Sequence, residues 1–534
     1  MELKIPHLLD VQRTYGAVQT KMVAKLCQRC QSYFGDAQSS YPCDDEACSL
    51  CLDLWDESVK SRLTDTLRQA CEPYGSFESN RFSFQTPATI SIPGDIRLRW
   101  ELTCVGKQPK KEFSEFQQNL KSHLRSHLVH HLQKHQGPEL EGYPHCVTNE
   151  EQGHLSVHLV VVQTLQLPRP QEFRPSLSKK TRKRFRGNDP TLKQGGDPLA
   201  NLQRRLSKSG HTIWSIPEVE TCLTKTRSLE TLLEWFGTQS TPKNALDMHF
   251  VVARRPFYVK AMYTKSRRDV SQSPFYVPDE KVGGMKKLGV SSVDEEITSV
   301  VAAAAGGMSK LNNSGDDDEI VYGLAKFHAS GREDMDVRML LPPEPTPGVG
   351  GRPFVCEVID ALRLPTPLDL QGVVQKINQT PEAGTVHQNR YGNNAIGVGI
   401  SDCLAFTPKA SFKNLQADTE DKVKYYGCLC WSKDPIPSEE YLRDKLAKCP
   451  IALQQRTPLR VLHRRSNAVR SRRVLTLKAT RIDHHYFRLN ISTEAGTYVK
   501  EFVHGDLGRT QPSVSSLLGS KTDILELDCE GIKL

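Results

Sequence analysis

The sequence predicts an α+β protein made of several domains, and three observations point to this class. Helical periodicity recurs, most clearly over residues 113–135. Strand-like segments lie between the helices, as in LSVHLVVVQTL (155–165) and DKVKYYGCLCW (421–431). A chain of 534 residues is also long enough for about two to four domains, with ample sequence for buried cores.

Composition and charge narrow the class of protein. With 25% charged and 37% hydrophobic residues, and no apolar run of about eighteen residues, we expect a soluble protein without a membrane span. The start lacks the apolar core and cleavage site of a signal peptide, so we expect a nuclear or cytoplasmic location and few disulfides. The net charge of +9 is uneven. Residues 174–186 and 455–473 are densely basic, which favours a polyanionic partner such as nucleic acid.

Two CxxC pairs near the N-terminus predict a structural zinc site. Cys27 and Cys30 form one pair, and Cys48 and Cys51 form the other. Each pair offers two thiolates from one turn, so four sulfurs can surround one Zn²⁺ ion tetrahedrally. Four cysteines leave no open position for a substrate, and we therefore expect the metal to be structural. Cys43 belongs to neither pair.

Residues 53–253 carry weaker signals. Periodicity predicts a helix over 59–71 and a longer amphipathic helix over 113–135, whereas alternation predicts a strand over 86–102. We expect the histidines of the longer helix to form a solvated face rather than a metal site: His123, His127, His130 and His131. The basic segment 179–186 is open to three interpretations, namely a disordered loop, a nuclear import signal or an electrostatic RNA contact.

From residue 248 the pattern changes to a strand followed by a basic loop. Cations in this loop stand beside aromatic side chains, which suits RNA, with phosphates on the cations and bases on the rings. The residues concerned are Lys265, Arg267 and Arg268, with Tyr263 and Phe275. The low-complexity segment 301–318 is predicted to be a flexible insertion after a short helix.

The charged stretch FHASGREDMDVR, residues 327–338, is the candidate centre of the chain. Gly331 permits a sharp turn, and Asp334 stands between two arginines that would hold its carboxylate ionised. Such a turn suits catalysis. A solvated network of surface ion pairs is the ordinary explanation of a charge run, and it stays open on local sequence.

Three C-terminal segments follow. In residues 421–431, alternation puts Tyr425 and Tyr426 on opposite faces of a strand. The arginine-rich residues 456–474 are predicted to form a strand or hairpin that follows an RNA backbone. Residues 484–513 predict a strand, a turn at a glycine and then a helix from about Tyr498, with Lys500 early in it.

Several of these motifs resemble those of one enzyme family. SGREDMDVR is similar to the catalytic motif of the pseudouridine synthases, and AGTYVKEFVHGDLGR to a later motif of that superfamily. The order of PFYV, TPLRVLHRR and KEFVHGD most resembles the tRNA T-arm enzymes of the Pus-ten type. The resemblance implies a catalytic domain with a mixed, mostly antiparallel sheet in 256–534, a THUMP-like RNA-binding α+β domain in 61–255 and a zinc-binding subdomain in 1–60.

The resemblance also implies roles for single residues. Asp334 would act on the target uridine as nucleophile or base, Tyr426 would stack on the flipped base and help to remove its C5 proton, and Lys500 would pair with the aspartate. Arg332 would help to displace the base. The other implied RNA contacts are Tyr498, Lys265, Arg267, Arg268, Arg464 and Arg465.

The implied activity is isomerisation of uridine to pseudouridine in the T arm of tRNA, at position 54, 55 or both. Zinc would be structural, and catalysis would need no metal or small-molecule cofactor. We expect a monomer that binds tRNA and no membrane. The rival hypotheses are a non-catalytic RNA-binding protein and another THUMP-bearing RNA modifier. The second would need a glycine-rich nucleotide-binding turn, but GVGG at 348–351 stands in a proline-rich loop.

Overall fold

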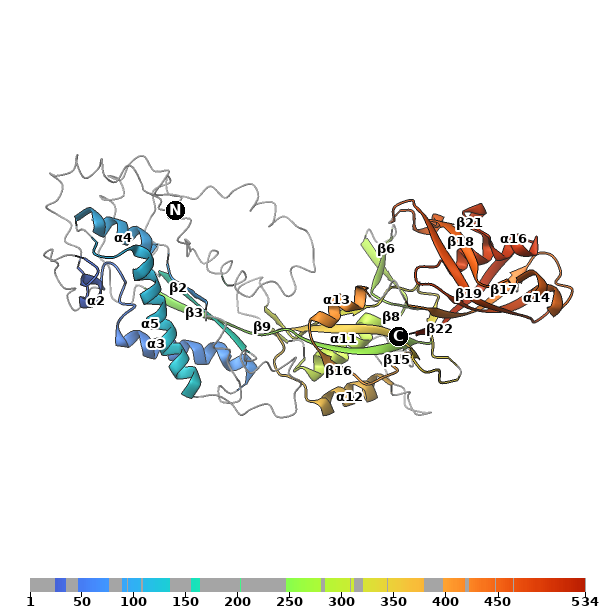
Figure 1. The fold of residues 1–534 in the computed structure, drawn as a ribbon. Helices are drawn as coiled ribbons and strands as arrows, with labels where there is room; N and C mark the ends of the chain where they lie inside the picture. The colour runs from blue at the N-terminus through green and yellow to red at the C-terminus, as the bar shows by residue number, and fades with distance from the viewer. Residues whose placement is uncertain are drawn as a thin grey trace. The chain divides into compact units, whose positions relative to one another are not determined.

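The computed structural model divides the chain into two compact units (Figure 1). The N-terminal unit comprises Met1–Arg255 and Ser309–Tyr322, and the C-terminal unit comprises Pro256–Met308 and Gly323–Leu534. Within the described residues, no helix combines the length and the apolar character that a membrane crossing requires. The structure describes residues 25–34, 47–75, 89–93, 95–106, 109–134, 155–163, 202, 246–279, 284–307, 309–311, 320–342, 344–378, 397–417, 422–446, 448–463 and 465–533.

The N-terminal unit combines helices with a small mixed sheet. Strand β2 pairs in parallel with β1 and antiparallel with β3, and a separate antiparallel pair joins β9 and β10. The helices predicted over 59–71 and 113–135 and the strand over 155–165 are confirmed as α3, α5 and β2. The elements are α2 (Gln28–Gln31), α3 (Glu57–Cys71), β1 (Thr89–Ser91), α4 (Asp95–Gly106), α5 (Phe113–Lys134), β2 (Leu155–Gln163), β3 (Leu246–Arg254), β9 (Ser309–Leu311) and β10 (Ile320–Tyr322).

The strand predicted over 86–102 is wrong beyond its first residues. Only β1 is extended, and α4 begins at Asp95 after a proline that ends the strand. Ile96 and Trp100 stand four residues apart and are both buried, which is helical spacing. Arg97 and Glu101 form an ion pair at the same spacing, with 2.7 Å between guanidinium and carboxylate.

A single thirteen-stranded sheet organises the C-terminal unit. Its strands are antiparallel apart from the parallel pair of β12 and β22, so the predicted α+β class with a mostly antiparallel sheet is confirmed. The path across the sheet is β11 (Leu324–Ala329), β14 (Arg352–Ile359), β4 (Phe257–Lys265), β12 (Arg338–Met339), β22 (Thr522–Lys533), β17 (Lys424–Ser432), β20 (Tyr486–Thr493), β19 (Val469–Arg481), β18 (Ile451–Arg456) and β21 (Thr510–Gln511). Three short strands join its sides: β13 (Val349–Gly350), β15 (Val398–Ile400) and β16 (Ala405–Thr407).

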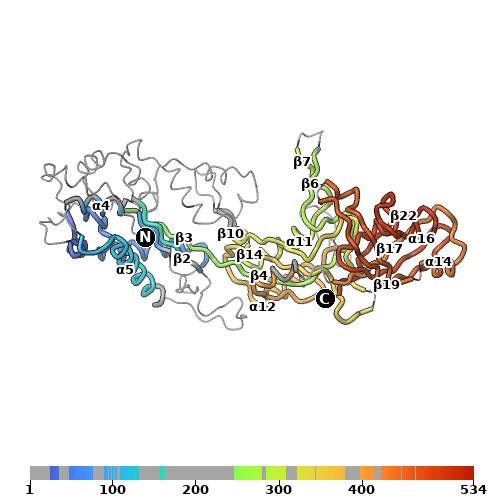
Figure 2. Tube along the Cα trace, turned by 45° about the horizontal axis from the view of Figure 1, so that its top comes forward, coloured from blue at the N-terminus to red at the C-terminus, as the bar shows by residue number. Residues whose placement is uncertain are grey.

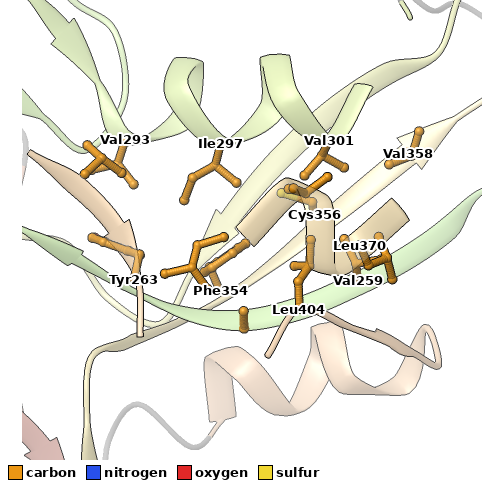
Figure 3. Close-up of a cluster of buried hydrophobic side chains, with 14 of the residues drawn as sticks. Val259, Tyr263, Val293, Ile297, Val301, Phe354, Cys356, Val358, Leu370 and Leu404 are labelled. Carbon is orange, nitrogen blue, oxygen red and sulfur yellow. The ribbon is translucent and has the colours of Figure 1, made fainter. Parts of the chain in front are cut away.

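Two hydrophobic cores form on this sheet. In the first, helix α11 (Val293–Ala304) lays Val293, Ile297 and Val301 over strands β4 and β14 (Figure 3). The second core joins β17 and β20 to three further helices. Tyr426 packs against both cores. The remaining helices are α12 (Pro367–Asn378), α13 (Ala410–Ala417), α14 (Glu439–Leu446), α15 (Val499–His504) and α16 (Val514–Leu518).

Helix α11 corrects the flexible insertion predicted over 301–318. Val301 and Ala305 are fully buried, because the alanine-rich run continues the helix and lays one side on the first core. Residues 309–311 form β9, which pairs with β10. Residues 308 and 312–318 lie outside the described residues, as do the basic segment 179–186 and Cys43.

Two hairpins in this unit carry residues that the sequence predicted to contact RNA. The β6 (Phe275–Asp279) and β7 (Gly284–Leu288) hairpin stands away from the sheet in Figure 2. The arginine-rich stretch forms the predicted strand–loop–strand, in which β18 leads through a 3₁₀ turn, η4 (Leu459–Val461), to β19. The strand, turn and helix predicted over 484–513 are confirmed as β20, a turn at Gly496 and α15. Two short strands, β5 (Val270–Ser271) and β8 (Ser291–Ser292), pair with each other elsewhere in the unit.

Candidate active site

The turn between β11 and β12 carries the candidate catalytic acid. Gly331 has φ +81°, a left-handed conformation that explains glycine at this position. The amide of Val337 donates to the carbonyl of Asp334 (3.1 Å), which closes the turn. The Asp334 side chain is 34% exposed, whereas that of its neighbour Glu333 is 2% exposed. Asp334 is therefore accessible from solvent, whereas Glu333 is part of the interior.

Glu333 belongs to a buried polar network beneath the turn. Its Oε2 lies 2.6 Å from Nε of Arg352, and its Oε1 accepts from the Tyr263 hydroxyl (2.5 Å). Gln272 donates to the same hydroxyl (2.9 Å), and Arg352 donates to the Ser330 carbonyl (2.8 Å). Burial raises the pKa of Tyr263, so its phenol stays protonated and donates. The network ties the backbone of the turn to β4 and β14.

Lys265 supports the turn from inside, which corrects its predicted contact with RNA. The side chain is buried, and its ammonium donates to the carbonyls of Val270 and Met335, at 2.8 Å each. A cation without exposed surface cannot meet a phosphate. Arg268 also holds the turn, because it donates to the Asp336 carbonyl (2.8 Å).

Two cations flank the Asp334 carboxylate. Nη1 of Arg460 lies 2.7 Å from its Oδ2, and Nζ of Lys500 lies 3.7 Å from the same oxygen. Each cation has a second acid: Arg460 Nε donates to Glu501 (2.8 Å), and Lys500 donates to Asp336 (2.7 Å). Partial burial acts to raise the pKa of Asp336, but the Lys500 ammonium outweighs it and the pKa is lowered. Asp334 thus has the predicted lysine beside it and an arginine closer still.

Helix α15 and the η4 turn place these two cations. Lys500 stands in the first turn of α15, whose start is fixed by the Gln455 side chain. The Gln455 amide accepts from the Tyr498 backbone N–H (2.9 Å) and donates to its carbonyl (3.0 Å). Gly505, with φ +81°, ends the helix. Arg460 projects from η4, which begins directly after Pro458.

Tyr426 lies at the junction of the two cores, on the same face of β17 as Cys428. Its hydroxyl is close enough to Arg352 and Glu333 for their charges to act on it. Burial raises its pKa, so the phenol is neutral near physiological pH and is a poor base in the unliganded protein. This environment favours a stacking role over removal of a proton.

The other predicted RNA contacts differ in how available they are. Arg332 is exposed and forms no ion pair among the described residues. Arg267 is held by both oxygens of Asp269, at 2.8 and 2.5 Å. Arg465 is exposed, whereas Arg464 lies outside the described residues. Contact of these side chains with RNA remains a prediction.

Sequence reasoning missed three residues of the site. Arg460 is one arginine among many in its stretch. Glu501 directly follows Lys500 and faces inward with 2% of its side chain exposed. Arg352 follows a glycine-rich loop with no sign of its burial. Only the proline-flanked TPLRV motif could have drawn attention to Arg460.

Four cysteines of the N-terminal unit form a candidate metal centre. Ligand sulfurs of Cys27, Cys30, Cys48 and Cys51 all lie within 4.8 Å of one another, and three of the side chains are buried. The Cys27 and Cys51 sulfurs are 3.8 Å apart. Zinc–sulfur bonds of about 2.3 Å in a tetrahedron put sulfurs about 3.8 Å apart, so the cluster has the dimensions of a Zn–Cys₄ site. No other group with metal-binding geometry occurs in the part of the chain that the structure describes, and the α5 histidines do not form one.

Comparison with known proteins relates this chain to one group. The family model described as "Pus10, C-terminal" matches residues 258–533. The Xenopus laevis "tRNA pseudouridine synthase Pus10" is 34% identical over 279 residues, 52% of this chain and 45% of the relative. The Homo sapiens protein of that name is 31% identical over 61% of this chain and 54% of its own length. The Thermofilum pendens protein is 31% identical over 52% of this chain and 53% of its own length. The chain thus spans about half the length of the relatives it matches.

A solved structure described as a Cbf5-Nop10-Gar1 complex overlaps 24% of this chain and 37% of its own, at 21% identity and a TM-score of 0.18. That score is too low to bear on the fold.

Proposed function

The chain belongs to the Pus10 family, and from that membership we propose that it is a tRNA pseudouridine synthase acting on a T-arm uridine, at tRNA position 54, 55 or both. The observation that carries the proposal is the Asp334 carboxylate, exposed on a braced turn and flanked by Arg460 and Lys500. Cations at this distance fix the orientation of a carboxylate.

The proposed reaction is an isomerisation within one nucleotide. Asp334 acts at C1′ or C2′ of the flipped uridine, and the N-glycosidic bond breaks. The uracil rotates and its C5 forms the new bond to C1′. This step breaks the bond between Asp334 and C1′ if the acid was the nucleophile, or returns the proton to C2′ if it was the base. C5 then loses a proton and N1 gains one. Atoms and electrons balance without an oxidant, nucleotide or metal. Tyr426 stacks on the base, and Arg332 takes up the space that the base vacates.

In this proposal, the basic surface of the C-terminal unit and the N-terminal unit both bind the body of the tRNA. The exposed arginines of the β18–β19 hairpin support a backbone contact in which cations replace counterions on phosphates. We assign the N-terminal unit a THUMP-like RNA-binding role, which its α+β composition supports. Zinc held by the four cysteines would stabilise the segment around them by linking its two knuckles.

The direct test uses the purified protein and an unmodified tRNA transcript, with pseudouridine mapped by chemical labelling. Wild-type protein is expected to convert a T-arm uridine. Asp334→Ala is expected to abolish conversion and to keep tRNA binding, while Asp444→Ala, which changes an exposed acid on α14, should convert normally. Conversion that survives Asp334→Ala would sink the assignment. Wild-type protein that binds tRNA but converts nothing would favour the non-catalytic alternative.

A further inference from the structure

Asp334 stands at the centre of a chain of alternating charges. The order is Glu501, Arg460, Asp334, Lys500 and Asp336. The successive nitrogen–oxygen distances are 2.8, 2.7, 3.7 and 2.7 Å. Three carboxylates share two cations, so each cation can leave one acid and still keep another.

The two cations are not equivalent. Lys500 is the more buried and lies nearer to Asp336 than to Asp334. Arg460 makes the short contact with Asp334, yet its side chain is 38% exposed. The tighter partner of the candidate catalytic acid is therefore also the one that an incoming RNA meets first.

Arg460 is anchored at one side of its guanidinium. Its Nε donates to Glu501, whose side chain is 2% exposed. The other Glu501 oxygen, Oε2, is buried and has no hydrogen-bond partner among the described residues. An arginine usually binds a carboxylate through two parallel bonds, and here the second bond is not made. A fork that includes Nε is completed by Nη2, so Nη1 can leave Asp334 while Nε stays bonded to Glu501.

The reaction gives a reason for such a movement. A carboxylate held by a charge-assisted bond of 2.7 Å is a weaker nucleophile and base than one whose oxygen is released. RNA supplies a competitor, because each nucleotide brings a phosphate. Arg456 and Arg465, exposed on the same hairpin as Arg460, attract that backbone to this edge of the site.

We propose that Arg460 is a substrate-released lock on Asp334: it holds the carboxylate in the unliganded protein and transfers to an RNA backbone phosphate beside the target nucleotide. Lys500 then remains as the single counter-ion of the freed acid. The inference rests on the proposed function for its meaning, but its test is a binding measurement that needs no turnover.

A double-substitution cycle on tRNA affinity tests the transfer. Removing the Asp334 charge releases Arg460, so Asp334→Asn should bind tRNA about threefold or more tightly than wild type. Arg460→Ala should weaken binding about tenfold and reduce the slope of log affinity against log salt by about one phosphate contact. The gain from Asp334→Asn should disappear in the double variant. Arg443→Ala, an exposed arginine on α14, controls for loss of a positive charge.

Two outcomes would overturn the proposal. One is additivity, with the Asp334→Asn gain unchanged when Arg460 is absent. The other is slower conversion by Arg460→Ala at unchanged affinity and salt slope, which would make Arg460 a fixed positioning residue. Arg460→Lys is the fold-preserving check, since it keeps the charge but cannot bond Glu501 and a phosphate together, and it should bind between wild type and Arg460→Ala. If wild-type protein converts no uridine, the proposed function is contradicted. The binding cycle still tests the transfer of Arg460, because it needs no turnover.

Discussion

At the scale of residues, two adjacent acids divide the work of the turn. Glu333 and Asp334 are adjacent in the chain, yet the side chain of the first is buried and that of the second is partly exposed. The inward one is neutralised by Arg352 and bonded to Tyr263, and the outward one meets two cations at the surface. Burial of an acid with its partners costs desolvation but fixes geometry. The position of Asp334 therefore depends on a residue that never meets substrate.

Removing the charge of Glu333 tests this dependence. Glu333→Gln leaves the Arg352 guanidinium buried without a counter-ion, and we expect it to lower the free energy of unfolding by about 3–5 kcal/mol. The double variant Glu333→Gln/Arg352→Met removes both charges and should recover part of that loss. Urea unfolding measures both. A single variant as stable as wild type would show that the pair does not hold the turn.

Lys265 predicts a dependence of stability on pH. Burial lowers its pKa from 10.5 to about 8, so the folded protein releases this proton at lower pH than the unfolded chain does. The folded state therefore gains stability as pH rises from about 8 towards 10.5, and the neutral amine can still donate to two carbonyls. The unfolding free energy of wild type, relative to Lys265→Met, should increase over that interval. A difference that stays constant from pH 7 to pH 10 would contradict the assignment.

At the scale of elements, α11 shows how one helix fixes the strands behind the turn. Its apolar residues recur at four-residue spacing and meet Phe354 and Cys356 of β14, the strand that also supplies Arg352 (Figure 3). The N-cap Ser292 accepts from the Glu295 N–H, and three acids follow in the first turn, which suits the helix dipole. Loss of packing under α11 should therefore loosen the turn that carries Asp334 as well.

Truncating Ile297 measures this contribution. The side chain is fully buried, so Ile297→Ala is expected to cost about 2–5 kcal/mol through lost contacts and the cavity left behind. Ser299→Ala changes an exposed residue of the same helix and should cost within about 0.5 kcal/mol. Chemical denaturation of the two variants gives the comparison. Equal stabilities would mean that α11 does not anchor the first core.

At the scale of the whole molecule, the chain folds as two units, and the candidate metal centre lies in the N-terminal one. The C-terminal unit has two extended hydrophobic cores on one sheet. The segment around the four cysteines buries apolar side chains such as Leu26 and Leu50, and bound metal would in addition link its two knuckles. Metal loss should thus affect one unit and spare the other.

Metal analysis and hydrogen exchange check this difference. Protein purified without chelator should contain about one equivalent of zinc, and Cys48→Ser should lower that content. The variant should lose exchange protection over residues 25–75 and keep it over β17, β20 and β22. Finding no metal in the wild type would refute the zinc proposal. Equal loss of protection in both units would contradict independent stabilisation.

The sequence by itself determined what depends on side-chain type and local spacing. Periodicity predicted α3, α5, β2 and β17, glycine and charge marked the turn at Gly331, and the two CxxC pairs predicted the cysteine cluster. It erred beyond residue 91 in the strand predicted over 86–102, and over residues 301–305 of the segment 301–318. There, alternation and low complexity masked helices whose buried faces become visible only against their neighbours.

Only the tertiary structure decided which groups meet. Arg460 lies 126 residues after Asp334, and Arg352 reaches Glu333 across neighbouring strands of the sheet. Local sequence carries no information about such pairings, because they follow from strand register and burial, which the whole chain sets together. The same reason moved Lys265 from a predicted RNA contact to an internal support. The local sequence was enough to predict the turn at Gly331. The ion pairs of the Asp334 carboxylate, by contrast, depend on the tertiary fold.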